Sequence, residues 1–107
     1  MMSIFDLLEE VRRRPGMYVA GDESQGALRL RSLEQLIHGY SLALRQHGIQ
    51  ESVVEFARDF GEFLWETRGW STSSGFAAAV LEAAGSDGAA WELFWRLVEE
   101  FRRARDG

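Results

Sequence analysis

Apolar residues recur at helical spacing through most of the chain, and capping or turn residues separate the stretches in which they do so. Three stretches open with a serine followed three positions later by an acidic residue or glutamine, the pattern of a capping box: Ser3 with Asp6, Ser32 with Gln35, and Ser52 with Glu55. Glycine follows three stretches at the position of a C-terminal cap: Gly48, Gly69 and Gly85. The pattern predicts helices over 3–13, 32–47 and 52–68, a short helix capped by a hydroxyl of 71–74 and ending at 84, and a last helix from 86 or 87 onward.

The last predicted helix has the broadest apolar arc, so we expect it to be the main core helix. Its apolar positions are Ala90, Trp91, Phe94, Trp95, Leu97, Val98 and Phe101. Strand patterns are weak, because Met17–Ala20 and Ala27–Leu30 are the only candidates and form at most a short hairpin. The sequence therefore predicts an all-α fold, a compact single-domain bundle of about five helices over 1–107, with at most a minor hairpin near residues 17–30.

The segment Arg14-Pro15-Gly16-Met17-Tyr18 interrupts the helical pattern. Proline fixes its own φ and disfavours the α region for Arg14, while glycine supplies a positive φ at no steric cost. Pro15 and Gly16 therefore suit the centre of a type II turn, and the first helix is expected to end just before Arg14. Met17 and Tyr18 follow this corner directly, and we expect both to pack back across the helices as structural residues.

The same segment resembles the opening of the ATP-binding domain of gyrase B and related type II topoisomerases. In that domain a helix with an acidic general base and an Asp-Asn pair follows, whereas this chain continues with Leu33-Glu34-Gln35-Leu36-Ile37-His38-Gly39-Tyr40. The chain has no Asp-Asn pair and no later glycine-rich lid, and its 107 residues are too few for that domain. An ATPase of this kind is therefore rejected.

The charge balance argues against a general nucleic-acid binder. The formal net charge is −5, whereas affinity for nucleic acid comes mainly from a basic face that neutralises phosphates. Two arginine clusters, at 12–14 and 102–105, fall in the last turns of predicted helices, where cations meet the negative end of the helix dipole. We therefore expect no nucleic-acid partner.

Composition also narrows the cellular context. The chain has no cysteine, and hence neither a disulfide framework nor thiol chemistry. Its start lacks the basic and then apolar pattern of a signal peptide, and its longest apolar run, Phe76–Leu81, is far shorter than the about 20 residues that cross a membrane. We expect a cytoplasmic protein that does not enter the membrane.

Few residues could carry catalysis or hold a metal. A nucleophilic enzyme would need His38 or His47 as its base, but the helical phase predicts a solvent-exposed His38, and His47 lies at a predicted helix end. Glu34 and His38 are four residues apart and could share a metal, yet no second acid-histidine pair completes such a site. No phosphate-binding glycine motif is present. The sequence predicts no catalytic residue, no metal site and no cofactor, and thus a protein that is not an enzyme.

One group of residues stands out, an acidic stripe on the predicted helix over 52–68. Its members step by four, four, three and four positions and are Glu51, Glu55, Asp59, Glu62 and Glu66. At this spacing they lie within an arc of about 80° on the helix, where like charges destabilise by about 0.2–0.5 kcal/mol per pair. Arg58 can reach two of them, but Glu66 has no basic residue four positions on.

Trp65 flanks the acidic stripe, away from the main apolar face of the helix. A tryptophan beside carboxylates is frequent in protein-binding hot spots. Two alternatives stay open at this point, because the stripe could be only a solvated polar face, and the region of Trp70 could cover Trp65. The stripe with Trp65 is the best candidate surface for a basic protein partner.

Landmarks along nearly the whole chain support a family resemblance. They are Ile4-Phe5, Leu8, 12–18, Leu33, Gly39-Tyr40, Ala43, Phe60, Phe63, Gly69-Trp70, Ala90, Phe94-Trp95, Leu97 and Glu100-Phe101. In this order they resemble a family of small, mostly uncharacterised bacterial proteins with an N-terminal Arg-Pro-Gly-Met-Tyr motif, associated with toxin-immunity neighbourhoods. The resemblance implies an immunity role and, for the motif and for Gly39, Tyr40 and Trp70, an architectural one. The segment 21–31 is longer than the resemblance leads us to expect.

We therefore expect a non-enzymatic protein-binding domain, and specifically an immunity or inhibitor protein that neutralises a basic toxin or enzyme. One alternative is a small-molecule-binding or enzymatic helical domain with an aromatic pocket of Tyr18, Tyr40 and Trp70. Another is a structural or homo-oligomeric module, which would show a wide apolar patch. The sequence does not identify the partner or the oligomeric state.

Overall fold

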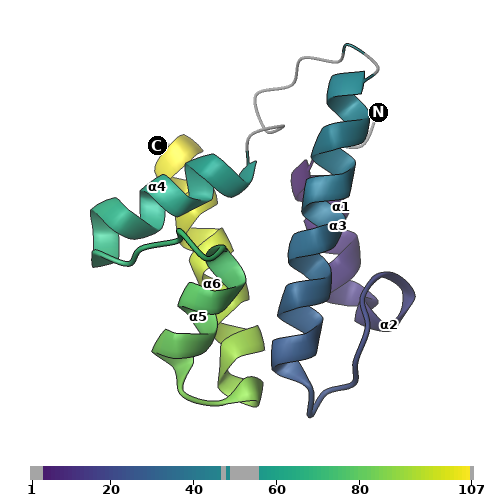
Figure 1. Ribbon diagram of the computed structural model, residues 1–107, viewed down its shortest axis with the longest axis vertical. Helices are drawn as coiled ribbons and strands as arrows, with labels where there is room; N and C mark the ends of the chain where they lie inside the picture. Colours follow the sequence, from purple (N-terminus) through teal and green to yellow (C-terminus); the bar gives the residue numbers. More distant parts are fainter. Residues whose placement is uncertain (1–3, 47, 49–55, 107) are drawn as a thin grey trace.

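Helices and their connections make up the computed structural model, which describes residues 4–46, 48 and 56–106 (Figure 1). The helices are α1 (Ile4–Arg13), α2 (Pro15–Tyr18), α3 (Gly26–Gln46), α4 (Phe56–Arg68), α5 (Phe76–Ala84) and α6 (Asp87–Asp106). The described residues form no strand, so the predicted all-α fold is confirmed. The helix beyond the expected five is the short α2.

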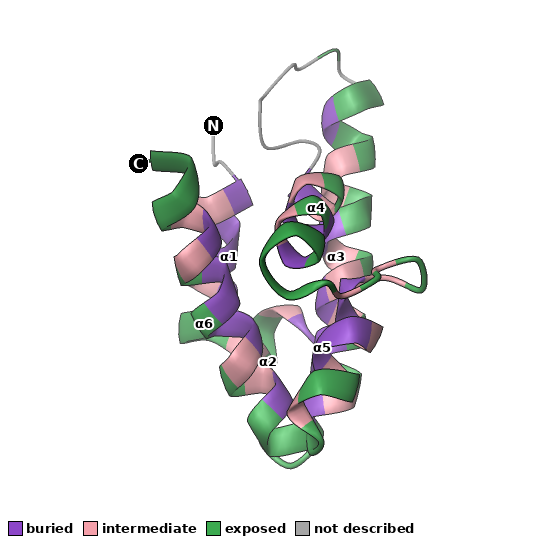
Figure 2. Cartoon of the chain, turned by 90° about the vertical axis from the view of Figure 1, so that its left-hand side faces the viewer, coloured by how far each residue is buried: buried purple, intermediate pink, exposed green. Residues whose placement is uncertain are grey.

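The core forms around α6, as its apolar arc predicts. This helix packs against both α3 and α5, and it buries Ala90, Phe94, Trp95, Leu97, Val98 and Phe101. Phenylalanine rings from three helices meet there. The ring centroid of Phe60 of α4 lies 5.7 Å from that of Phe76 of α5 and 5.8 Å from that of Phe94 of α6, and both pairs are edge to face. Figure 2 marks the buried residues along the helices. Edge-to-face pairs of this kind stabilise a core by more than the burial of their apolar surface alone.

The motif at Pro15 differs from its prediction. Arg14 leaves the helical region, with φ −134° and ψ 62°, so α1 ends there as expected. Pro15, however, begins one further helical turn instead of a type II turn, and Gly16 has no positive φ. The fixed φ of proline suits the first position of a helix equally well, which explains the difference. Tyr18 packs partly buried against the core, but Met17 is 70% exposed, so its predicted packing is wrong.

The start of α3 also differs from its prediction, because the helix begins at Gly26 and not at Ser32. The actual start resembles a capping box: the backbone N–H of Asp22 donates to Oε1 of Gln25 (3.0 Å), while Oδ1 of Asp22 accepts from the N–H of Ser24 (2.9 Å). Ser32 instead accepts, through Oγ, a hydrogen bond from the backbone N–H of Ala20 (3.0 Å). The predicted hairpin near residues 17–30 is therefore wrong, since its second strand lies inside α3.

Close approach of two helix starts explains why Gly26 opens α3. A Cβ at this position would lie 1.8 Å from the carbonyl oxygen of Asp87, the first residue of α6. Only glycine lets the two backbones meet there. The contact fixes the N-terminal ends of α3 and α6 against each other.

Glycine ends two of the helices as predicted, because Gly69 after α4 and Gly85 after α5 both have a positive φ. The start of α5 is different: no hydroxyl of 71–74 caps it, and its N-cap residue is Gly75. Within the part of the chain that the structure describes, no helix has the length and apolar composition needed to cross a membrane.

Candidate functional site

The inner face of α4 determines which residues its outer face presents. Phe56, Phe60 and Leu64 repeat every four residues and are buried, which turns the opposite side of the helix outward. Glu62, Trp65 and Glu66 lie on that exposed side. Glu51 and Glu55, also assigned to the acidic stripe, lie outside the described residues.

Asp59 belongs to the stripe by sequence, but its charge is paired. Its side chain is only 22% exposed and lies 3.4 Å from Nη1 of Arg105 on α6 and 3.2 Å from Nε of Arg58. Arg58 therefore forms its ion pair with Asp59 and not with Glu62. Asp59 contributes to the packing of α4 on α6 more than to a free surface.

Glu62 and Glu66 form no ion pair with any residue that the structure describes. Trp65, between them in sequence, is 61% exposed, so the alternative in which the region of Trp70 covers it is wrong. Single exposed apolar side chains are common on protein surfaces, so Trp65 indicates a docking surface only together with the unpaired carboxylates beside it.

A groove runs along this face of α4. It has a volume of about 390 Å³ and is lined by Arg58, Gly61, Glu62, Trp65, Glu66, Trp70, Ser71 and Thr72. We call it the α4 groove. Its walls come from α4 on one side and from the connection 69–75 on the other.

The connection forms the second wall because the chain reverses directly after α4. Gly69 takes φ +71° and donates its N–H to the carbonyl of Trp65 (2.8 Å), and Trp70 then turns back beside the helix. Thr72 comes so close to Gly61 that a Cβ added at position 61 would lie 2.6 Å from Oγ1 of Thr72. Gly61 thus allows the connection to lie against α4, which the sequence pattern alone did not indicate.

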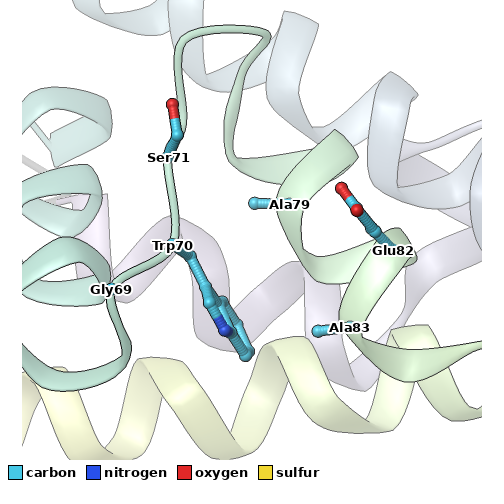
Figure 3. A pocket seen from close by; sticks show the side chains of 6 residues that line it. All are labelled: Gly69, Trp70, Ser71, Ala79, Glu82 and Ala83. Carbon is cyan, nitrogen blue, oxygen red and sulfur yellow. The ribbon is translucent and has the colours of Figure 1, made fainter.

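Trp70 also lines a second pocket, shown in Figure 3. This pocket has a volume of about 370 Å³ and is lined by Gly69, Trp70, Ser71, Ala79, Glu82 and Ala83. We call it the Trp70 pocket. In Figure 3 the indole of Trp70 lies on one side, and Ala79, Glu82 and Ala83 follow α5 on the other.

A third pocket, of about 350 Å³, adjoins Trp70 and contains the arginines Arg68 and Arg96. The guanidinium of Arg68 lies 5.7 Å from the centroid of the Trp70 ring, and it also pairs with Glu100 of α6 at 2.8 Å. The α4 groove thus has Glu62 and Glu66 together with Arg58, the Trp70 pocket has Glu82, and the third pocket has two arginines.

The aromatic pocket of Tyr18, Tyr40 and Trp70 is not assembled at any of these three pockets, since neither tyrosine lines them. All three residues pack, partly buried, against the core. Gly39, also assigned an architectural role, is exposed in the middle of α3, and a Cβ there would meet no atom within 4 Å. No steric need for glycine at position 39 follows from the fold.

Glu34, considered above as half of a metal pair, has another role that the sequence did not reveal. Its Oε2 accepts a hydrogen bond from the backbone N–H of Ala77 at 3.2 Å, so a carboxylate from α3 caps the start of α5. His38 is exposed, as its phase predicts, and His47 lies outside the described residues. Within the described ranges, no three histidine or acidic side chains are arranged to hold a metal ion.

Two arginines of the clusters at 12–14 and 102–105 form ion pairs between α1 and α6. Nη1 of Arg12 lies 2.6 Å from Oε1 of Glu99, and Nη1 of Arg102 lies 3.3 Å from Oε1 of Glu9. The hydrogen bond and charge of Arg12 hold the pKa of Glu99 below its usual value. These arginines are therefore partly neutralised within the molecule.

Comparison with known proteins adds no assignment: no protein-family model matches the chain, and no curated protein or solved structure shows significant similarity to it. The resemblance to small immunity-associated proteins therefore stays a prediction.

Proposed function

We propose that the chain is a non-enzymatic protein-binding domain whose docking surface is the α4 groove, and that its partner is a basic protein. The observation that carries the proposal is the exposed Trp65 between two unpaired carboxylates, Glu62 and Glu66. Tryptophan is among the residues that supply most binding energy at protein interfaces, and surrounding charges set the choice of partner.

Charge supports a basic partner over an acidic or neutral one. The chain carries a formal charge of −5, and Glu82 adds a further exposed carboxylate at the adjoining Trp70 pocket. Such a surface speeds association with a protein of opposite charge. The specific role that we propose is that of a cytoplasmic immunity or inhibitor protein, supported by this acidity together with the family resemblance.

Differential capture tests the proposal. The double variant Glu62→Arg/Glu66→Arg is compared with a matched control, Glu23→Arg/Glu92→Arg, which changes the net charge equally at two other exposed positions. The proposal predicts a basic protein that binds the wild type and the control but not the first variant. A partner retained equally by both variants would exclude the α4 groove.

The immunity role has a separate test in the neighbouring gene. A large product that ends in a basic, nuclease-like domain is expected there, and its toxicity should be neutralised by the wild type and less well by Trp65→Ala. A neighbour without such a domain, or full protection by Trp65→Ala, would contradict this role while leaving protein binding open.

A further inference from the structure

We infer that the Trp70 pocket is a binding site for one arginine side chain of the basic partner. The inference rests on the proposed function and extends it from a surface to a specific side chain. The Trp70 pocket adjoins the α4 groove, because Trp70 and Ser71 line both. A partner segment lying in the groove can therefore place a side chain in the pocket.

The size and lining of the pocket suit a long side chain with a charged end. Its volume of about 370 Å³ lies at the small end of the range of about 300–1,000 Å³ in which proteins bind ligands. Ala79 and Ala83 give its wall on α5 small apolar side chains, against which a methylene chain packs. Glu82 is the one charged residue among the described residues that line it.

The chemistry of the two walls favours a guanidinium. A flat cation is attracted to the face of an indole ring and pairs with a carboxylate at the same time, and guanidinium suits both contacts better than the more strongly hydrated ammonium of lysine. The protein itself provides a comparison, because the guanidinium of Arg68 lies 5.7 Å from the Trp70 ring centroid. Arg68 lines the third pocket and not the Trp70 pocket, and none of the described residues that line the Trp70 pocket carries a positive charge.

Glu82 has the position that such a site requires. It is exposed on α5 and forms no ion pair with the described residues, so its charge is available to a partner. Figure 3 shows its carboxylate on the α5 side of the pocket, while the indole of Trp70 comes from the other side and extends toward the level of Ala83. An arginine side chain between the two would contact an aromatic ring and a carboxylate.

The test is a titration with N-acetyl-arginine amide, followed through the tryptophan indole N–H signals in nitrogen-15 NMR spectra. We expect a saturable shift of the Trp70 signal, assigned with Trp70→Phe, that exceeds the shifts of the buried Trp95 and the partly buried Trp91. N-acetyl-norleucine amide, which lacks the charge, should give no such shift. An equal response to N-acetyl-lysine amide would contradict the preference for guanidinium.

Two variants that leave the fold intact localise the binding. Glu82→Gln should weaken it by about 2- to 5-fold, as expected for an exposed ion pair, whereas Glu92→Gln on α6 should not. Ala83→Leu should fill the pocket and abolish the saturable shift, whereas Ala43→Leu, at another exposed helical alanine, should preserve it. Unchanged Trp91 and Trp95 signals verify that each variant is folded.

The outcomes separate this inference from the proposed function. A shift confined to Trp65 and lost in Glu62→Arg/Glu66→Arg would overturn the Trp70 pocket as the arginine site and leave the α4 groove as the docking surface. No shift at Trp70 up to the solubility limit of the probe would also overturn the inference. Binding retained in both Glu82→Gln and Ala83→Leu would do the same.

Discussion

Replacing Gly26 by alanine tests how the fold positions its helices. The added Cβ would lie 1.8 Å from the carbonyl oxygen of Asp87 and 2.6 Å from its carbonyl carbon. Both are backbone atoms at the start of α6 and cannot rotate away as a side chain would. The first turns of α3 and α6 must therefore separate, and this pair of helices forms a main contact of the core.

The magnitude follows from two opposing effects. Overpacking of this kind destabilises by about 1–3 kcal/mol and occasionally more, and a clash between two backbones belongs at the upper end. Alanine in the middle of a helix gains roughly 0.5–1 kcal/mol over glycine, and at the first residue of α3 this gain offsets at most that part of the cost. We expect a net loss of about 2–3 kcal/mol in the free energy of unfolding, or roughly 10–20 °C in melting temperature for a domain of this size.

Gly39→Ala is the matched control, because both glycines lie in α3 but a Cβ at position 39 meets nothing within 4 Å. It should stabilise the protein by about 0.5–1 kcal/mol through helix propensity alone. Urea and thermal unfolding followed by circular dichroism measure both variants. Wild-type stability of Gly26→Ala, or a loss in Gly39→Ala equal to that in Gly26→Ala, would refute the close approach of α3 and α6.

Three further predictions concern single contacts. Glu34→Ala should destabilise by about 1 kcal/mol in chemical denaturation, because the N–H of Ala77 loses its cap; stability equal to wild type would show that this hydrogen bond is unimportant. The pKa of Glu99 should lie below its usual value of 4.5. Its pairing with Arg12 should stabilise the fold above pH 4.5 and cease to do so as the pH falls through the lowered pKa. Carbon-13 NMR should find a higher pKa of Glu99 in Arg12→Gln, and an unchanged pKa would contradict the pairing. Gly16→Ala should leave the free energy of unfolding unchanged or raise it, since Gly16 is helical and open to solvent. A clear loss of stability would instead favour the type II turn that the sequence predicts.

Local patterns predicted much of the fold because local chemistry determines those features. The apolar arc of α6 identified the core helix, and Gly69 and Gly85 marked two helix ends that the structure has. The start of α3 was missed although its signal was present, since Asp22 with Gln25 has the capping-box spacing and Ser32 has it too. When two such pairs compete, packing decides between them.

The site was only partly predictable, because its shape depends on contacts between distant residues. Spacing alone placed Glu62, Trp65 and Glu66 on one exposed face of a helix. The groove beside them needs Thr72 to approach Gly61, and no sequence pattern encodes that distance. The pairing of Asp59 with Arg105 could not be foreseen either, because 46 residues separate them along the chain.

The central claim is that the α4 groove docks a basic protein, and the most direct measurement is the salt dependence of its association rate with the captured partner. The account predicts that Glu62→Arg/Glu66→Arg slows association and flattens this dependence, while Glu23→Arg/Glu92→Arg changes it less, because charges near an interface act mainly on encounter. Trp65→Ala should leave association nearly unchanged and raise the dissociation rate at least about 10-fold, as the loss of a buried aromatic anchor does. Equal association rates for the two charge-reversed variants, together with an unchanged dissociation rate for Trp65→Ala, would contradict the account.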